Sequence, residues 1–344
     1  MSARIRIAAG ALMVAGLGLL TAPLPASAHT GALFSWGEHY NSENQDEWYA
    51  FGTVSGTDAS FALLPEPQNL PIWTTGAEIC DESAWAVGMF DDEPVRFTWD
   101  HDTGAISEPV GLTADPVDFP DAQAVTVVET WAADSLDDCV GIAYVAYNVV
   151  YGPENNVDVL TVAYVNPDGS TLPITELPRD FEQDFVDWMG IATDPTTGTT
   201  YLFGQIGNES FYSVLDVDSG ITSLPIALAG IQEHFDSSGL PIEADFEPDG
   251  RLWLLYQVNA LETIHLLTFD PGADLSAGPT DVGAVTPVNL HEWFMGNTVL
   301  TYDPYVPVLP ATGGVPGGAL VAGAALLLAG AAMAGLSSRA RRAN

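Results

Sequence analysis

The stretch Ala192–Phe203, with the sequence ATDPTTGTTYLF, returns 52 residues later as Ala244–Leu255, with the sequence ADFEPDGRLWLL. In both copies an apolar run ends in a turn containing Pro, Asp and Gly residues, and a run of aromatic and aliphatic residues follows. Such a turn reverses the chain between two neighbouring strands. The two copies therefore predict the same β-hairpin at two places in the chain.

A second turn marker has the form D-x-D-[S/T]-G and occurs at Asp100–Gly104 and at Asp216–Gly220. Asn166–Gly169 and Asp270–Gly272 occupy similar places. The four turns follow one another at steps of 66, 50 and 54 residues, which is close to the length of one four-stranded blade. A repeat of this length predicts a β-propeller.

Short apolar runs bounded by Gly, Pro, Asp or Asn fill the chain between Thr30 and Val308, without a helical pattern of useful length. The predicted fold class is therefore all-β, with a propeller-like domain over 29–303. Its length corresponds to about five blades, with six or seven possible, and a pair of large β-sandwiches is the competing fold. The strands after Gly31 and the strand near Tyr302 could complete one blade together, which would remove a free sheet edge.

The N-terminal segment, 1–28, has the pattern of a secretory signal peptide. Arg4 and Arg6 precede an apolar run, and Ala26 and Ala28 are the small residues that signal peptidase requires before a cut after Ala28. An uncleaved N-terminal anchor is the alternative, but the apolar run is shorter than a membrane-spanning helix. The sequence therefore predicts export.

The C-terminal end carries three features in a fixed order after a short linker, 304–308. They are a pentapeptide, an apolar segment long enough to form a transmembrane helix, and a basic cytoplasmic tail that would stop transfer through the membrane. The pentapeptide is Leu309, Pro310, Ala311, Thr312 and Gly313 (309–313), and the apolar segment is 315–336. The basic tail is 337–344 and contains Arg339, Arg341 and Arg342. An ordinary C-terminal membrane anchor is the alternative.

This tail resembles the sorting signals of LPxTG cell-wall-anchored proteins, which are substrates of sortases. The resemblance covers Leu309–Asn344 only. It implies that a sortase cleaves after Thr312 and that an amine of a peptidoglycan precursor resolves the acyl-enzyme. The protein would then be secreted and covalently anchored to the wall of a Gram-positive, actinobacterial cell. Its expected partners are signal peptidase, the sortase and the peptidoglycan precursor.

The charge balance excludes several function classes. Between the two predicted cleavage points only Arg96, Arg179 and Arg251 oppose all 46 acidic residues, which gives this part a net charge of −43. Such a field repels nucleic acid and other polyanions, so no nucleic-acid partner is expected. The chain also contains no lysine, which excludes the lysine-linked shaft of a sortase-built pilus.

Cys80 and Cys139 are the only two cysteines in the chain. In an exported protein an even number favours a disulfide over two buried thiols. Whether the bond can form depends on how close the fold brings their Cα atoms, which the sequence does not show.

The D-x-D-[S/T]-G markers offer carboxylate pairs that could hold Ca²⁺, at Asp100, Asp102, Asp216 and Asp218. They lack the longer ligand series and the distant Glu of an EF-hand loop. Asp and Gly also dominate tight turns for conformational reasons, and that interpretation is favoured. The six histidines show no zinc-site spacing. No cofactor is therefore expected, apart from this weak calcium candidate.

Flat aromatic side chains could line a sugar- or peptide-binding face. The tryptophans in or beside predicted loops are Trp36, Trp48, Trp73, Trp131 and Trp188. Those in apolar runs, which are expected in the core, are Trp85, Trp99 and Trp253. Packing between blades is the favoured interpretation for most of them.

The expected function is a binding or scaffolding module near the wall for an unknown extracellular ligand, without enzymatic activity. A wall-bound glycan hydrolase is the first alternative, because pairs such as Asp184/Asp187 and Glu243/Asp245 could serve a glycosidase. A structural protein whose charge retains cations is the second. Two or three carboxylates that converge in the central funnel with raised pKa values would indicate the hydrolase.

Overall fold

The chain forms two compact units, and the computed structural model describes residues of one of them, Gly31–Val306. The described residues are 32–41, 46–64, 72–80, 83–100, 104–136, 139–153, 155–181, 184–259, 261, 263–287 and 293–303. The sequence predictions for 1–28, 304–308, 309–313, 315–336 and 337–344 lie outside these residues. Within the described residues, no helix is both long enough and apolar enough to cross a membrane.

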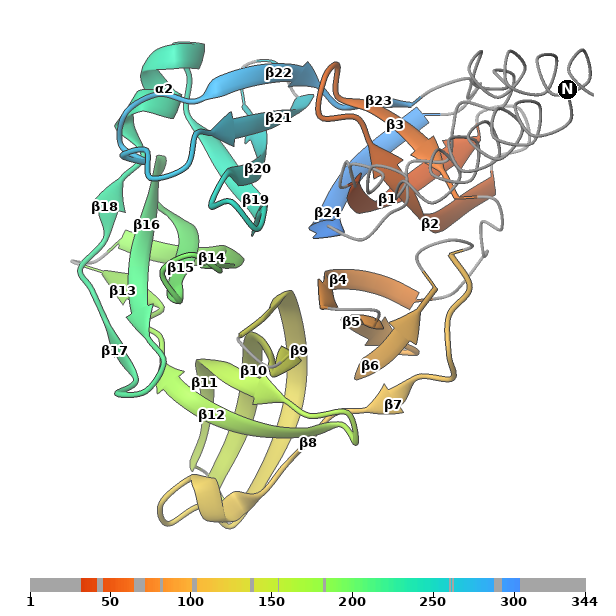
Figure 1. The fold of residues 1–344 in the computed structure, drawn as a ribbon. Helices are drawn as coiled ribbons and strands as arrows, with labels where there is room; N and C mark the ends of the chain where they lie inside the picture. Colours follow the sequence, from red (N-terminus) through yellow and green to blue (C-terminus); the bar gives the residue numbers. More distant parts are fainter. Residues whose placement is uncertain are drawn as a thin grey trace, which may run out of the picture. The chain divides into compact units, whose positions relative to one another are not determined.

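Five sheets surround a central axis as the blades of a propeller (Figure 1). The prediction of an all-β propeller with about five blades is confirmed. Blade I consists of β4 (Ile72–Cys80), β5 (Ser83–Phe90), β6 (Glu93–Trp99) and β7 (Val110–Gly111). Blade II consists of β9 (Ala124–Ser135), β10 (Gly141–Gly152), β11 (Asn155–Val165), β12 (Ser170–Glu176) and β8 (Thr113–Ala114).

The other three sheets continue the same order from the axis outward. Blade III consists of β14 (Asp184–Asp194), β15 (Thr199–Ile206), β16 (Glu209–Asp216) and β17 (Ile221–Thr222), with β13 (Asp180–Phe181) on β14 and β18 (Ile226–Ala227) on β16. Blade IV consists of β19 (Gly239–Phe246), β20 (Leu252–Val258), β21 (Thr263–Phe269) and β22 (Thr280–Ala284). Blade V consists of β24 (Trp293–Asp303), β1 (Ala32–Asn41), β2 (Asp46–Val54), β3 (Ser60–Leu63) and β23 (Thr286–Pro287).

The repeated stretch forms the hairpin between the two inner strands of a blade. In blade III the turn follows Asp194, whose Oδ1 accepts hydrogen bonds from the backbone N–H and the hydroxyl of Thr196. In blade IV the turn contains Gly250, whose φ of +87° is a conformation that glycine adopts without strain. The matching alanines of the two copies, Ala192 and Ala244, lie in one hydrophobic core between these blades.

Each hydrophobic core lies between two neighbouring blades, and five such cores encircle the axis. Strand β20 shows how one strand serves two of them. Its Leu254 and Tyr256 face the core shared with blade III, whereas Trp253 and Leu255 face the core shared with blade V. Because both faces are buried, the strand is apolar from Leu252 to Tyr256 instead of alternating.

Blade V is completed by both ends of the described chain. Strand β24 pairs with β1 in antiparallel register, with Leu33 opposite Tyr302 and Phe34 opposite Thr301. This pairing confirms the predicted closure of the ring.

A disulfide joins Cys80 at the end of β4 to Cys139 beyond the end of β9, with the two Cα atoms 5.5 Å apart. The bond therefore links blades I and II.

Two short helical segments lie between strands of the described chain. The 3-10 turn η1 (Pro116–Asp118) is capped by the side chain of Asp115, which accepts a hydrogen bond from Val117 N–H. The helix α2 (Ala229–Phe235) connects blades III and IV.

Candidate functional site

The innermost strands of the five blades are held to one another by side-chain hydrogen bonds around the axis. At least one such bond joins each neighbouring pair: Thr75 Oγ1 to Thr130 O, Trp131 Nε1 to Trp188 O, Ile191 N to Glu243 Oε1, Tyr302 N to Asp245 Oδ2, and Ile79 N to Thr301 Oγ1. The bonds close a complete circuit through β4, β9, β14, β19 and β24. The inner strands are therefore fixed relative to one another, and so are the positions of the side chains that they direct toward the axis.

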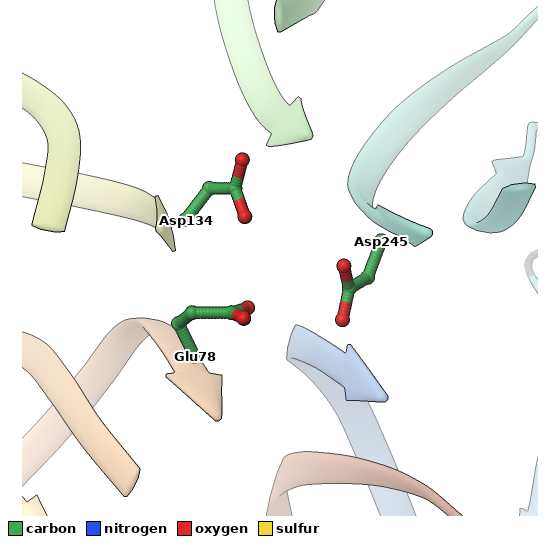
Figure 2. A group of neighbouring side chains, drawn as sticks. All are labelled: Glu78, Asp134 and Asp245. Carbon is green, nitrogen blue, oxygen red and sulfur yellow. The ribbon is translucent and has the colours of Figure 1, made fainter. Parts of the chain in front are cut away.

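Three carboxylates converge on this axis near the carboxyl ends of their strands. Glu78 extends from β4, Asp134 from β9 and Asp245 from β19, and Figure 2 shows them pointing toward one another. One oxygen from each lies within 4.8 Å of the others, and all three side chains are buried. We call Glu78, Asp134 and Asp245 the axial carboxylates.

Each of the two remaining blades places one threonine beside the axial carboxylates. Thr301 on β24 donates a hydrogen bond to Glu78 Oε2 at 3.2 Å, and its hydroxyl also interacts with Asp245. Thr193 on β14 hydrogen-bonds to Asp134. Each blade thus contributes one oxygen-bearing side chain, so the five inner strands share a common register at this level.

A fourth carboxylate, Glu243, lies two residues before Asp245 on β19. Its Oε1 accepts hydrogen bonds from Ile191 N–H and Ala244 N–H, both at 3.2 Å. Its Oε2 is buried and has no hydrogen-bond partner among the described residues, and the same is true of Asp134 Oδ2. The sequence pair Glu243/Asp245 is thus brought to the axis, where two carboxylate oxygens lack a donor.

Burial and mutual repulsion keep these groups from ionising easily. Burial raises the pKa of Asp134 to about 7. The pKa values of Glu78 and Asp245 are raised well above their usual range by burial and then by the neighbouring negative charges, and burial does the same for the pKa of Glu243. An arginine would reverse this effect, but the arginines among the described residues lie elsewhere. Arg96 stacks on Trp85 and Arg251 pairs with Asp270.

A pocket of about 380 Å³ opens between the earlier parts of the same inner strands. Its walls include Trp73, Trp131, Trp188 and Phe185. Trp73 and Phe185 are 51% and 61% exposed, whereas the indole N–H of Trp188 donates to Pro178 O and holds that ring in place. We call this the aromatic pocket.

Charged groups of both signs line the aromatic pocket. Glu129 on β9 and Asp187 on β14 supply carboxylates, and the guanidinium of Arg179 supplies a positive charge. Partial burial raises the pKa of Asp187. The pocket therefore combines flat apolar faces with hydrogen-bond acceptors, a cation and a carboxyl group that holds its proton more firmly than usual.

Three of the tryptophans that were expected in or beside loops, Trp73, Trp131 and Trp188, thus meet in one pocket. Trp36 does not, because it lies within β1 at 1% exposure and packs against Phe51 between blades V and I. The side chain of Trp48 lies outside the described residues. Trp85, Trp99 and Trp253 are buried between blades, as expected.

The D-x-D-[S/T]-G markers form turns at the edges of blades. Asp216 Oδ1 accepts a hydrogen bond from Ser219 N–H, and Gly220 has a φ of +67°. Asp218 is exposed at the same turn, and Gly104 closes the matching turn after Asp100 with a φ of +80°. Asp102 lies outside the described residues. The carboxylates that do converge are the axial ones, which the sequence did not single out as a metal site.

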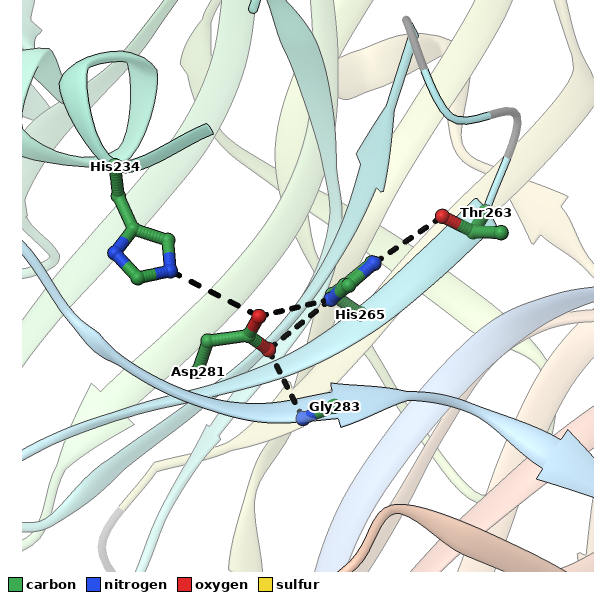
Figure 3. A network of polar contacts seen from close by, with 5 residues as sticks. All are labelled: His234, Thr263, His265, Asp281 and Gly283. Carbon is green, nitrogen blue, oxygen red and sulfur yellow. Dashed lines mark hydrogen bonds and ion pairs between the residues drawn. The ribbon is translucent and has the colours of Figure 1, made fainter. Parts of the chain in front are cut away.

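A separate polar network joins helix α2 to blade IV (Figure 3). His265 Nδ1 lies 3.0 Å from Asp281 Oδ1, and its Nε2 lies 3.1 Å from Thr263 Oγ1. Asp281 also accepts from Gly283 N–H and lies 3.8 Å from His234 Nε2. Every polar atom of the nearly buried His265 ring has a partner, so the network fastens α2 and β22 to β21.

Solved propellers resemble the chain at low sequence identity. A gluconolactonase from Xanthomonas campestris is 13% identical with a TM-score of 0.41, over 81% of this chain and 91% of that one. A luciferin-regenerating enzyme is 12% identical with a TM-score of 0.36, over 76% and 78%. A family-43 glycoside hydrolase is 12% identical with a TM-score of 0.38, over 61% and 72%. No family model and no curated protein matches the chain.

The prediction that the domain is not an enzyme is wrong. The similar propellers include enzymes, although at such identities they show the fold alone. The convergence of carboxylates with raised pKa values that the sequence analysis named for a hydrolase occurs at Glu78, Asp134 and Asp245, which lie outside the aromatic pocket. The sequence missed it because these residues are far apart in the chain.

Proposed function

We propose that the propeller is a glycan hydrolase that binds a saccharide in the aromatic pocket. The observation that carries this proposal is the composition of the pocket, in which exposed Trp73 and Phe185 lie with Glu129, Asp187 and Arg179. Flat aromatic faces stack on the apolar faces of sugar rings, and carboxylates accept hydrogen bonds from sugar hydroxyls. Arg179 provides a planar fork for an anionic substituent on the sugar.

The chemistry follows from the two carboxyl groups. Glycosidases use one carboxyl group as a proton donor and a second as a base or nucleophile. Asp187 is suited to the first role, because partial burial raises its pKa. As the C–O bond to the leaving sugar breaks, the Asp187 proton passes to the leaving oxygen. Glu129 then takes a proton from the water whose oxygen bonds to the anomeric carbon.

Two variants in the full-length chain test the binding and the chemistry separately. Trp73→Ala removes a stacking face and should weaken saccharide binding by about tenfold. Asp187→Asn should leave binding in place and lower the turnover number by about 10²- to 10⁴-fold. The substrates are soluble glycan strands released from bacterial wall, and the measurements are new reducing ends for turnover and titration calorimetry for binding.

Two matched controls accompany these variants. Leu224→Ala removes an exposed apolar side chain elsewhere, and Asp158→Asn removes an exposed carboxylate of blade II outside the pocket. Both should behave as the wild type. A wild-type rate for Asp187→Asn would refute the assigned acid. Equal binding by Trp73→Ala and Leu224→Ala would remove the aromatic pocket as the saccharide site.

We further propose that this hydrolase acts while attached to the cell wall. The support is the order of features in the sequence: a signal-peptide pattern over 1–28, the pentapeptide 309–313, the apolar segment 315–336 and the basic tail 337–344. Thr312→Ala should move the protein from the wall fraction to the membrane fraction or the medium, because the pentapeptide would lose the threonine side chain that the sorting motif contains. Immunoblots of the three fractions measure this. An unchanged wall fraction would disprove the anchoring.

A further inference from the structure

The axial carboxylates are buried close together, and the hydrogen bonds that they receive do not fully compensate their burial. Glu78, Asp134 and Asp245 are buried with an oxygen from each within 4.8 Å of the others. Burying even one carboxylate costs several kcal/mol unless a cation or hydrogen-bond donors compensate it. The hydrogen bonds from Thr301, Thr193 and Tyr302 N–H supply part of that compensation. They supply no positive charge.

A second observation points to a missing positive partner. Asp134 Oδ2 and Glu243 Oε2 are buried without a hydrogen-bond partner among the described residues. Glu243 lies on the same face of β19 as Asp245, and its charge repels those of Glu78, Asp134 and Asp245. Buried carboxylate oxygens without a donor are rare, because each leaves its desolvation uncompensated. Both oxygens belong to the group of acids around the axis.

We propose that Glu78, Asp134 and Asp245 bind one Ca²⁺ ion on the propeller axis. Oxygens held around one Ca²⁺ at about 2.4 Å can lie at most about 4.8 Å apart, and the axial carboxylate oxygens satisfy this limit. An all-oxygen set selects a hard cation. Mg²⁺ keeps several of its waters, whereas Ca²⁺ exchanges them readily for carboxylates, which suits a buried site.

This ion would also have a structural consequence. Its ligands come from blades I, II and IV, and Thr301 and Thr193 hold those ligands from blades V and III. One ion would thus tie the inner strands of all five blades. The site does not depend on the proposed hydrolase, because the residues that define the aromatic pocket are different.

The test uses the full-length chain purified in EDTA and then titrated with CaCl₂. The wild type should show one saturable site by calorimetry and a higher melting temperature with Ca²⁺, since a ligand of the folded state stabilises it. Asp134→Asn should weaken this site by at least about 10- to 100-fold, which is the loss that mutation of an outer-shell partner of a ligand already causes. In EDTA the same variant should melt at or above the wild-type temperature, because it removes one of the repelling charges. If Asp134 had a purely structural role, the melting temperature of the variant would differ from that of the wild type in the same direction with Ca²⁺ and in EDTA.

Asp216→Asn is the matched control, because it removes an exposed turn carboxylate of the type that the sequence offered for Ca²⁺. It should titrate and melt as the wild type does. Glu78→Gln is the second variant and should repeat the behaviour of Asp134→Asn. With two variants, the test does not depend on the correct folding of a single one. The proposal fails if the wild type and both axial variants bind Ca²⁺ alike, since the acidic surface would then be the only binder. It also fails if the wild type shows no saturable site.

Discussion

Replacing both Cys80 and Cys139 with alanine is expected to lower the free energy of unfolding by about 4 kcal/mol. The disulfide closes a loop across a sequence separation of 59 residues, and it restricts the unfolded chain much more than the folded one. The folded geometry is compatible with the bond, because the Cα atoms lie 5.5 Å apart. Equilibrium unfolding in urea, followed by tryptophan fluorescence, measures the loss.

The reduced wild type is the control for this double variant. Dithiothreitol should bring its unfolding midpoint to that of the variant, because both then lack the same cross-link. The variant itself should not respond to dithiothreitol. A double variant that unfolds at the oxidised wild-type midpoint would show that the bond does not stabilise the ring.

Thr301→Val is expected to cost about 3 kcal/mol, although it removes only one hydroxyl. Thr301 is completely buried, accepts a hydrogen bond from Ile79 N–H at 3.1 Å and donates one to Glu78 Oε2 at 3.2 Å. Valine has nearly the same volume but can do neither, so a buried N–H and a buried carboxylate oxygen lose a partner at once. Urea unfolding of the wild type and the variant measures the difference.

Thr301→Ser provides the comparison that isolates the hydroxyl. It keeps both hydrogen bonds and loses one methyl group, which costs about 1 kcal/mol. Valine should therefore be clearly worse than serine at this position. The reverse order would mean that packing, and not the hydrogen bonds between blades V and I, determines stability there.

The sequence predicted the fold because its signals are local. The hairpin at Ala192–Phe203 and the turn at Asp216–Gly220 depend on residues adjacent in the chain, and the structure places turns at both. Trp36 shows the limit of such signals. Gly37 and Glu38 follow it and suggest a loop, yet all three lie in β1, because the neighbouring blades decide what is buried.

The axial carboxylates could not be found from local signals, because Glu78 and Asp245 are more than 160 residues apart. One signal was nevertheless present. An alanine directly precedes the axial residue on four of the inner strands, in Ala77-Glu78, Ala133-Asp134, Ala192-Thr193 and Ala244-Asp245. Aligning the repeats on these alanines would have brought the axial positions into one column. The small residue fits there because the inner strands of neighbouring blades come close together around the axis.

The pairing of Ala32 with Asp303 also sets the timing of folding. The ring cannot close until β24 has been synthesised, so an incomplete chain exposes the unpaired edge of β1 and the apolar faces of the two neighbouring blades that pack against β24. Contacts between such distant residues form slowly. Exposed strand edges invite pairing with other chains. A chaperone that holds the chain open until residue 303 is available would therefore raise the yield of folded protein.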